Sequence, residues 1–175
     1  STQGLRFIVT QLGVLRAPRV FIADATEAVI RYALGKSRVL GKKVAAFERK
    51  VEVPIRPGSR QKVFYRQYDA SFDLGLGRFL DVDVKKWSSF NPLFLSKEAR
   101  KLQKDIAIKF VREGNFDTLR WAIPKGLQGN RGAIEQWILK QFDSRLVKSR
   151  IDAADLQNAK NAFTSALQRG LIEFY

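Results

Sequence analysis

The stretch FYRQYDASFDLGLGRFLDVDVKKW, residues 64–87, restricts the fold more than any other part of the chain. It alternates apolar and polar residues on both sides of the sequence Gly75-Leu76-Gly77, a pattern that predicts two strands joined by a hairpin turn. The even positions form an apolar face: Phe64, Tyr68, Ala70, Phe72, Leu74, Leu80, Val82 and Val84. The odd positions form a polar face: Gln67, Asp69, Ser71, Asp73, Asp81, Asp83 and Lys85.

The polar face of this hairpin carries four aspartates, although the chain has a net charge of +15. Aspartate is a poor strand former, and like charges that face each other across two strands destabilise the pair. If Leu74 faces Arg78, the register sets Asp69 opposite Asp83. Solvated strand faces usually mix Thr, Lys and Glu, whereas carboxylates gathered in this way suit a divalent cation that also binds phosphate oxygens. We therefore favour a metal site over a merely solvated face.

The composition restricts the chemistry further. The chain has no histidine, which excludes His-based acid–base catalysis, Ser-His-Asp and Cys-His triads, and His-ligated zinc. It has no cysteine and so no disulfide framework. Lys and Arg number 32 against 17 Asp and Glu, and such an excess indicates a polyanionic partner: nucleic acid most commonly, with an anionic membrane or an acidic protein as alternatives. An enzyme of this composition has to use Asp, Glu and Lys, with a hard metal that prefers oxygen ligands.

The 175 residues predict a single domain, with one hydrophobic core and helices that cover a small mixed sheet, in the α/β or α+β class. A strand is predicted at 116–124, after the hairpin. The second predicted helix is short or runs into a strand. No run approaches the about 18 apolar residues of a membrane span. The predicted helices cover residues 23–37, 39–53, 95–115, 133–146 and 152–170.

The hairpin resembles that of the PD-(D/E)xK nucleases, in which one strand carries an acid and the next carries an acid-x-Lys triplet. Asp69 in RQYD matches the first acid, Asp83-Val84-Lys85 matches the triplet, and thirteen residues lie between the two aspartates. The phrasing RQYD…GRFLDVDVKKW is also similar to the nuclease domains at the C-termini of polymorphic bacterial toxins, including contact-dependent growth-inhibition toxins. The chain departs from the motif at two positions: Tyr68 stands where the motif has Pro, and the acid of the triplet is Asp83 rather than the commoner Glu. Because Asp is one methylene shorter than Glu, Asp81 is an alternative for the second acid.

The resemblance covers about residues 41–124 and implies a restriction-endonuclease-like core, with residues 1–40 and the helices of 132–170 as additions. It implies metal-dependent phosphodiester hydrolysis in which Asp69 and Asp83 hold Mg²⁺ or Mn²⁺. Lys85 would position the attacking water or stabilise the transition state. A helix before the hairpin would add Glu48 as a further acid, with Glu27 as the second candidate. Phosphate contacts are expected from the surplus of cations: Lys97, Arg100, Lys101, Lys104, Arg120 and Lys125.

The likeness to toxins carries expectations about biology. It implies that this domain is released from a larger secreted protein and then acts in the cytoplasm of a target cell. The domain itself is not expected to insert into a membrane. The missing initiator Met fits such an origin. It implies an acidic immunity protein that covers the site. DNA is slightly favoured over tRNA as substrate. The alternative is a non-catalytic basic nucleic-acid-binding domain, which explains the charge but leaves the four aspartates unexplained.

Overall fold

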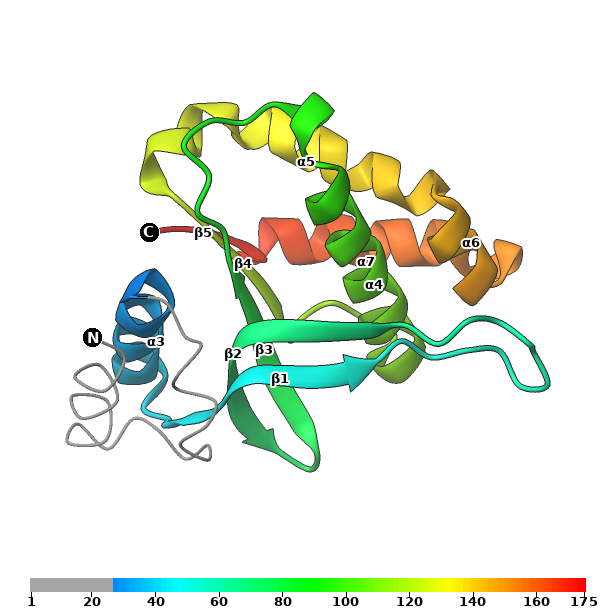
Figure 1. The fold of residues 1–175 in the computed structure, drawn as a ribbon, viewed down its shortest axis with the longest axis horizontal. Coiled ribbons are helices and arrows are strands. Elements are labelled where there is room, and N and C mark those ends of the chain that lie inside the picture. Colours follow the sequence, from blue (N-terminus) through cyan, green and yellow to red (C-terminus); the bar gives the residue numbers. More distant parts are fainter. Residues whose placement is uncertain (1–26) are drawn as a thin grey trace.

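The computed structural model describes residues 27–175, and these form a mixed α+β fold around a five-stranded sheet (Figure 1). The strands follow one another across the sheet in chain order. The first three are antiparallel, and the last two run parallel to the third, so the predicted mixed sheet is confirmed. Their bounds are β1 Val44–Glu52, β2 Tyr65–Gly75, β3 Arg78–Val84, β4 Leu119–Ile123 and β5 Ile172–Phe174.

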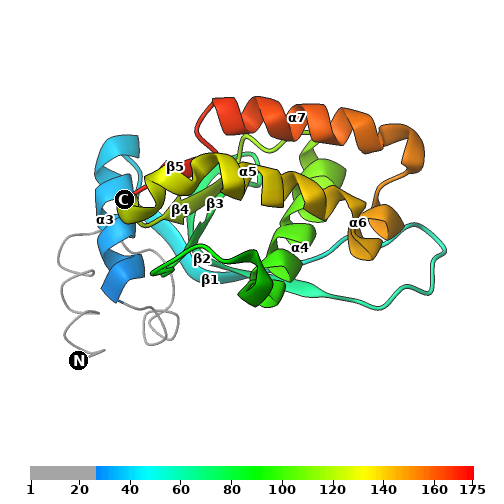
Figure 2. The same ribbon diagram turned by 90° about the horizontal axis from the view of Figure 1, so that it is seen from above.

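Helices cover both faces of this sheet, and Figure 2 shows α3 set apart from the group α4–α7 with the strands between them. The α-helices are α3 Glu27–Leu40, α4 Ser96–Glu113, α5 Arg131–Lys140, α6 Arg145–Arg150 and α7 Leu156–Gln168. Short 3₁₀ turns connect them: η1 Pro92–Phe94, η2 Lys125–Asn130, η3 Gln141–Asp143 and η4 Ala153–Asp155. No helix within residues 27–175 has the length and apolar character needed to cross a membrane.

The two faces of the sheet bury separate hydrophobic clusters. Val29, Ile30 and Ala33 of α3 pack on one face. The other face carries the larger cluster, in which α4, α5 and α7 bury Trp121 and Phe116 completely. The predicted helix at 23–37 starts within residues 1–26, which lie outside the described part, and its described portion continues to Leu40.

Residues 44–52 form strand β1, so the alternative of a helix that runs into a strand describes 39–53 better, and a helix over the whole segment is wrong. Only its first two residues end a helix, α3. Val44, Phe47 and Val51 are spaced three and four apart, which imitates a helical period. A register shift between Val44 and Ala46 places Val44 and Phe47 on the same face, and the strand changes face at Glu48, which has a φ of +54°. Phe47 therefore packs beneath α3, whereas Val51 packs on the α4 side.

The hairpin register agrees with the prediction away from the turn. Ala70 pairs with Val82 and Ser71 with Asp81, which sets Asp69 across from Asp83. At the turn itself, Gly75 rather than Leu74 pairs with Arg78, because a bulge shifts the register. The two turn residues, Leu76 and Gly77, both have positive φ, as in the type I′ turn that suits the twist of a hairpin.

The predicted faces of the hairpin are correct from Ala70 onward but wrong for Tyr68, which packs with the α4 cluster while Ala70 and Phe72 pack beneath α3. Most of the polar face is not solvated, although Gln67 and Asp73 at its margins are exposed. Helix α4 covers it, and Ser71, Asp81, Asp83 and Lys85 are all buried there. A buried polar face requires partners for its charges, and these partners define the site described below.

Strand β5 has no counterpart in the sequence prediction. Gly170 adopts a φ of +93° directly after α7, and the chain then turns back to pair Ile172 with Trp121. Figure 1 shows β5 beside β4, with the C-terminus close to the end of the sheet. The last residue, Tyr175, donates a hydrogen bond of 2.6 Å from its hydroxyl to the carbonyl of Lys85. The C-terminal segment thus completes the sheet next to the predicted triplet.

Candidate active site

Asp83 and Lys85 form the buried centre of the candidate site, at the end of strand β3. The Lys85 ammonium donates hydrogen bonds to the carboxylates of Asp83 and of Glu98, which comes from the first turn of α4. Arg66 on β2 donates a second charged hydrogen bond to Asp83, with 2.6 Å between the guanidinium Nη2 and Oδ2. Burial opposes ionisation of Asp83, but Lys85 and Arg66 outweigh it and hold the pKa of this carboxyl well below its usual value.

Asp69 lies beside Asp83 on the neighbouring strand, as its place in the register requires. The backbone N–H of Val84 donates to Asp69 Oδ2 at 2.7 Å and fixes this carboxyl at the sheet surface. Burial, together with the hydrogen bond and negative charge of Asp83, raises the pKa of Asp69 to about 7. Near neutral pH, Asp83 is therefore ionised while Asp69 is partly protonated.

A second layer of buried contacts fixes these groups. Asp105 of α4 accepts from Arg66 Nε at 2.9 Å and from the indole N–H of Trp121 at 3.0 Å. The Trp121 ring lies beneath Lys85, with 3.8 Å between the ammonium and the ring centroid. Because both acids, the lysine and their supports sit on strands and a long helix, the geometry is rigid. Such preorganisation is what an electrostatic catalyst needs.

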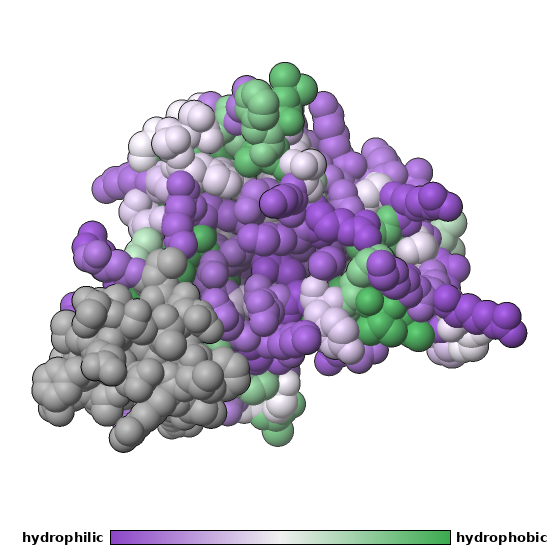
Figure 3. All heavy atoms as spheres, in the orientation of Figure 1, coloured by the Kyte–Doolittle hydropathy of each residue, from purple (hydrophilic) through white to green (hydrophobic). Residues whose placement is uncertain are grey.

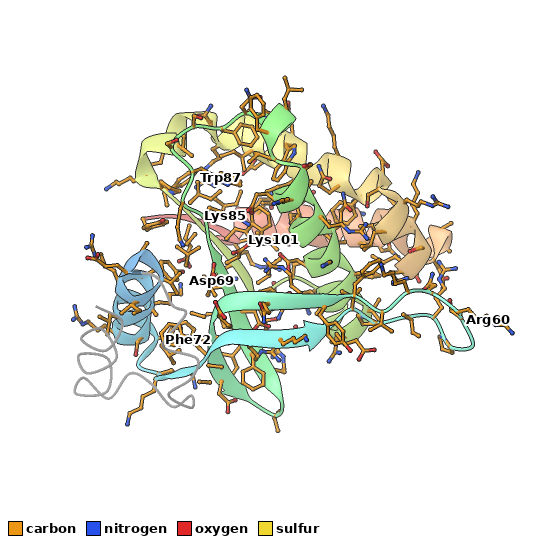
Figure 4. The ribbon with its side chains drawn as sticks, in the orientation of Figure 1. Arg60, Asp69, Phe72, Lys85, Trp87 and Lys101 are labelled. Atoms are coloured by element: carbon orange, nitrogen blue, oxygen red, sulfur yellow. The ribbon has the colours of Figure 1, made fainter. Side chains whose placement is uncertain are left out.

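An open cavity of about 540 Å³ borders Asp69 and Arg66, which connect it to the buried Asp83. Asp69 lines it from the sheet, and Lys101 and Lys104 line it from α4. Figure 4 shows Asp69, Lys85 and Lys101 near one another between α3 and α4, and Figure 3 shows that this part of the surface is hydrophilic. A negatively charged group in the cavity therefore meets cations on the helix side and carboxylates on the sheet side.

Glu48 reaches the same cavity, but it does so from strand β1 rather than from the predicted helix. Phe47 and Arg49 pair with Ala70 and Tyr68, so Glu48 lies level with Asp69. Glu27, the second candidate, instead pairs with Arg31 at 2.9 Å on the exposed surface of α3 and does not line the cavity.

Asp81, the alternative second acid, is occupied elsewhere. Its carboxylate accepts from Lys109 at 2.8 Å, from Arg49 at 2.6 Å and from the Ser71 hydroxyl at 2.6 Å. These partners neutralise it and fill its acceptor positions beneath α4. The structure thus uses Asp81 to hold the sheet to the helix and leaves Asp83 as the acid beside Asp69.

The carboxylates of this site fit a hard divalent cation that keeps most of its water. No three acidic side chains in the part of the chain described come together as a protein-only cage. Mg²⁺ takes one or two carboxylates and retains several waters, and Asp69 with Asp83 provides such a pair. A cation bound between them would relieve the repulsion of the two carboxylates. Glu48 lines the same cavity as a further oxygen donor.

The predicted phosphate contacts divide into two groups. Lys97, Arg100, Lys101 and Lys104 all lie on α4, and the last two line the cavity. Arg120 lies apart, because its guanidinium pairs with Glu173 at 3.5 Å and donates to backbone carbonyls. Lys125 is exposed on η2, also outside the cavity.

Sequence reasoning missed Arg66, Glu98 and Asp105. The sequence did contain an indication for Arg66. This residue occupies an even position of the hairpin, where the other side chains face the core, and a buried charge there requires a partner. Glu98 gave no distinct signal, because an acid in the first turn of a helix is ordinary. Asp105 lies among apolar residues of α4 and is completely buried, so its pairing could be read only from the packed structure.

The pKa of Asp69 predicts a pH dependence of stability. An aspartate in an unfolded chain ionises near pH 4, whereas Asp69 in the folded protein ionises at about pH 7. Because the folded state holds the proton more tightly, this group's contribution to stability is complete below about pH 4 and is lost as the pH rises to about 7. The loss is at most about 4 kcal/mol, from three pKa units at about 1.36 kcal/mol each.

We therefore expect Asp69→Asn to gain stability relative to the wild type as the pH rises through this window. Urea unfolding at several pH values measures the difference, with Asp73→Asn as the control because Asp73 is an exposed aspartate of the same strand. Parallel pH profiles for the wild type and Asp69→Asn would contradict the raised pKa.

No protein-family model, curated protein or solved structure matches this chain.

Proposed function

We propose that this chain is a metal-dependent nuclease that hydrolyses phosphodiester bonds of nucleic acid, with DNA slightly favoured over tRNA. One observation carries the proposal: Asp69 lies beside Asp83, the partner of the buried Lys85, and lines a cavity to which helix α4 contributes Lys101 and Lys104. Burial and the neighbouring Asp83 raise the pKa of Asp69 to about 7, and a divalent cation bound beside the two carboxyls would favour its ionised form.

The site residues have separate roles in the proposed reaction. Asp69 and Asp83 would hold Mg²⁺ or Mn²⁺, with Glu48 reaching the ion through one of the waters that it keeps; the ion would supply a Lewis acid for the phosphate and lower the pKa of a bound water. Lys85, oriented by Asp83 and Glu98, donates hydrogen bonds to the attacking water or to the charge that develops on the phosphate. Lys101 pairs loosely with Glu98 at 3.4 Å and is half exposed, so it remains free to meet a phosphate oxygen.

We further propose that the hairpin, β4 and α4 form a restriction-endonuclease-like core, as the motif resemblance implies. The same resemblance supports a role as the toxin domain of a larger secreted protein that acts in the cytoplasm of a target cell. Its partner would be an acidic immunity protein, since a surface with a net charge of +15 favours rapid capture by an acidic one.

One observation favours a non-catalytic nucleic-acid-binding module as the second candidate. Asp83 is already paired with Lys85 and Arg66, so it is neutralised without a metal. The two functions differ in their response to divalent cations, because the binding module needs none.

A cleavage assay tests the proposal directly. Plasmid DNA and total tRNA are incubated with the protein, with and without Mg²⁺ or Mn²⁺, and compared with Asp69→Asn. We expect metal-dependent cleavage that the variant loses by at least about 100-fold. Asp73→Asn is the matched control, since its carboxylate only accepts the turn N–H of Gly75 at 2.8 Å. Salt-sensitive binding without cleavage in any metal would favour the binding module.

Metal binding has a readout that does not depend on cleavage. At pH 7.5, Mg²⁺ should raise the melting temperature of the wild type, because a ligand at 10 to 100 times its Kd stabilises the folded state by about 1.4–2.7 kcal/mol. Asp69→Asn should lose this response and Asp73→Asn should keep it. Equal responses in all three proteins would exclude Asp69 as a metal ligand.

A further inference from the structure

Four cations converge on one aromatic ring beside the cavity, and the motif analysis singled out only two of them. Phe64, at the end of the β1–β2 loop (residues 53–64), has Arg100 at 4.5 Å and Arg150 at 5.6 Å from its ring centroid. Lys62 and Lys104 each lie at 5.7 Å. We call Lys62, Arg100, Lys104 and Arg150 the cation cluster. The four come from three separate elements, so the cluster is a product of the fold.

The cation cluster has no acidic counterpart. Within residues 27–175, none of its four members forms an ion pair, although Arg66 nearby pairs with two carboxylates. Arg150 is 7% exposed, and its buried Nε finds no hydrogen-bond partner among the described residues. Burial and the proximity of Arg100 lower the pKa of both Lys104 and Arg150. Like charges kept together at this cost indicate that an anion belongs among them.

The position of the cluster specifies which anion fits. Lys104 belongs both to the cluster and to the lining of the cavity that contains Asp69. Lys104 follows Glu98, the partner of Lys85, by six residues on α4, which is about 9 Å along the helix axis. A strand of nucleic acid with one phosphate at the carboxylates can thus present a neighbouring phosphate to the cluster.

We infer that the cation cluster is a second phosphate-binding site, which holds a phosphodiester near the scissile one on the same polynucleotide strand. The inference rests on the proposed function for the identity of the ligand. The β1–β2 loop supplies Lys62 and is fixed against α6 by a hydrogen bond of 2.8 Å from Arg150 to the carbonyl of Lys62. Figure 1 shows this loop extending from the sheet beyond α4, so it lengthens the surface available to a strand.

The test measures binding rather than cleavage. Lys62 and Arg100 are exposed, so the double variant Lys62→Gln/Arg100→Gln should fold, and the matched control is Arg38→Gln/Lys42→Gln, two exposed cations at the end of α3. Both double substitutions are combined with Asp69→Asn, so that the protein does not cleave the nucleic acid during the measurement. Binding of a labelled single-stranded 12-nucleotide oligomer is measured by fluorescence anisotropy without metal, at a series of salt concentrations. We expect the variant of the cation cluster to bind the oligomer about 10-fold more weakly. The slope of the logarithm of the binding constant against the logarithm of the salt concentration should also become shallower. The loss of two phosphate contacts reduces this slope by about 1.8 on duplex DNA and by somewhat less on a single strand.

The control should change affinity less than twofold at the same salt. Equal losses in the two variants would overturn the inference, because only net charge would then matter. Pyrophosphate titrated by calorimetry is the second probe. If it binds through Lys62 and Arg100 while 12-mer binding is unaffected by their loss, the site serves a free phosphate compound and the polynucleotide assignment is wrong. If the cluster variant loses oligomer binding but the wild-type protein does not cleave nucleic acid with any metal, the second phosphate site is supported and the proposed nuclease function is refuted.

Discussion

Replacement of Lys85 by methionine is expected to reduce phosphodiester cleavage about 10³-fold while the protein remains folded. Methionine keeps the length of the side chain above Trp121 but removes the ammonium that bridges Asp83 and Glu98. Asp83 retains Arg66 as a partner, and Glu98 retains Lys101. The change therefore removes a charge from the site without leaving either carboxylate unpaired.

The neighbouring residue supplies the control for this experiment. Lys86 is exposed, whereas Lys85 is buried, so Lys86→Met removes the same charge one position away and should retain nearly full activity. Initial rates on plasmid DNA and tRNA in Mg²⁺, with circular dichroism to check folding, give the comparison. A folded Lys85→Met protein that cleaves at the wild-type rate would remove Lys85 from the proposed mechanism.

The second large effect concerns stability. Arg66→Met should lower the free energy of unfolding by about 3–5 kcal/mol, because it removes the cation shared by Asp83 and Asp105 and leaves buried negative charge without compensation. Arg66 is 3% exposed, so water cannot take over its role. Urea unfolding at neutral pH measures the loss.

An exposed arginine in an ion pair provides the comparison. Arg78 pairs with Glu113 at 3.0 Å with about half of its side chain in solvent, and Arg78→Met should cost no more than about 1 kcal/mol. Adding Asp105→Asn to Arg66→Met should restore part of the lost stability, because Asp105 loses its cation in that variant whereas Asp83 keeps Lys85, and asparagine still offers an acceptor to Trp121. Similar losses in Arg66→Met and Arg78→Met would show that the buried network contributes no more than a surface pair.

The strength of local patterns decided how much could be predicted from sequence. The position of the Gly75-Leu76-Gly77 turn predicted that Asp69 faces Asp83, and this is correct although Gly75 rather than Leu74 pairs with Arg78. At residues 39–53 the sequence left a short helix and a helix that runs into a strand as alternatives, because a register shift and the positive φ of Glu48 break the alternation of β1. Strand β5 was not predicted, since three residues carry too little pattern to be distinguished from a loop.

The hairpin, its register away from the turn, and its acids and lysine follow from a period of two and from residue types close in the chain. The pairing of the charges depends on how the helices pack on the sheet. Helix α4 packs over the polar face, where its Lys109 pairs with Asp81. Asp83 pairs with Lys85 and Arg66. The same helix supplies Glu98 and Asp105, which accept hydrogen bonds from this lysine and arginine. Burial raises the energetic cost of an unpaired charge, and pairing between residues distant in sequence depends on packing that no local pattern encodes.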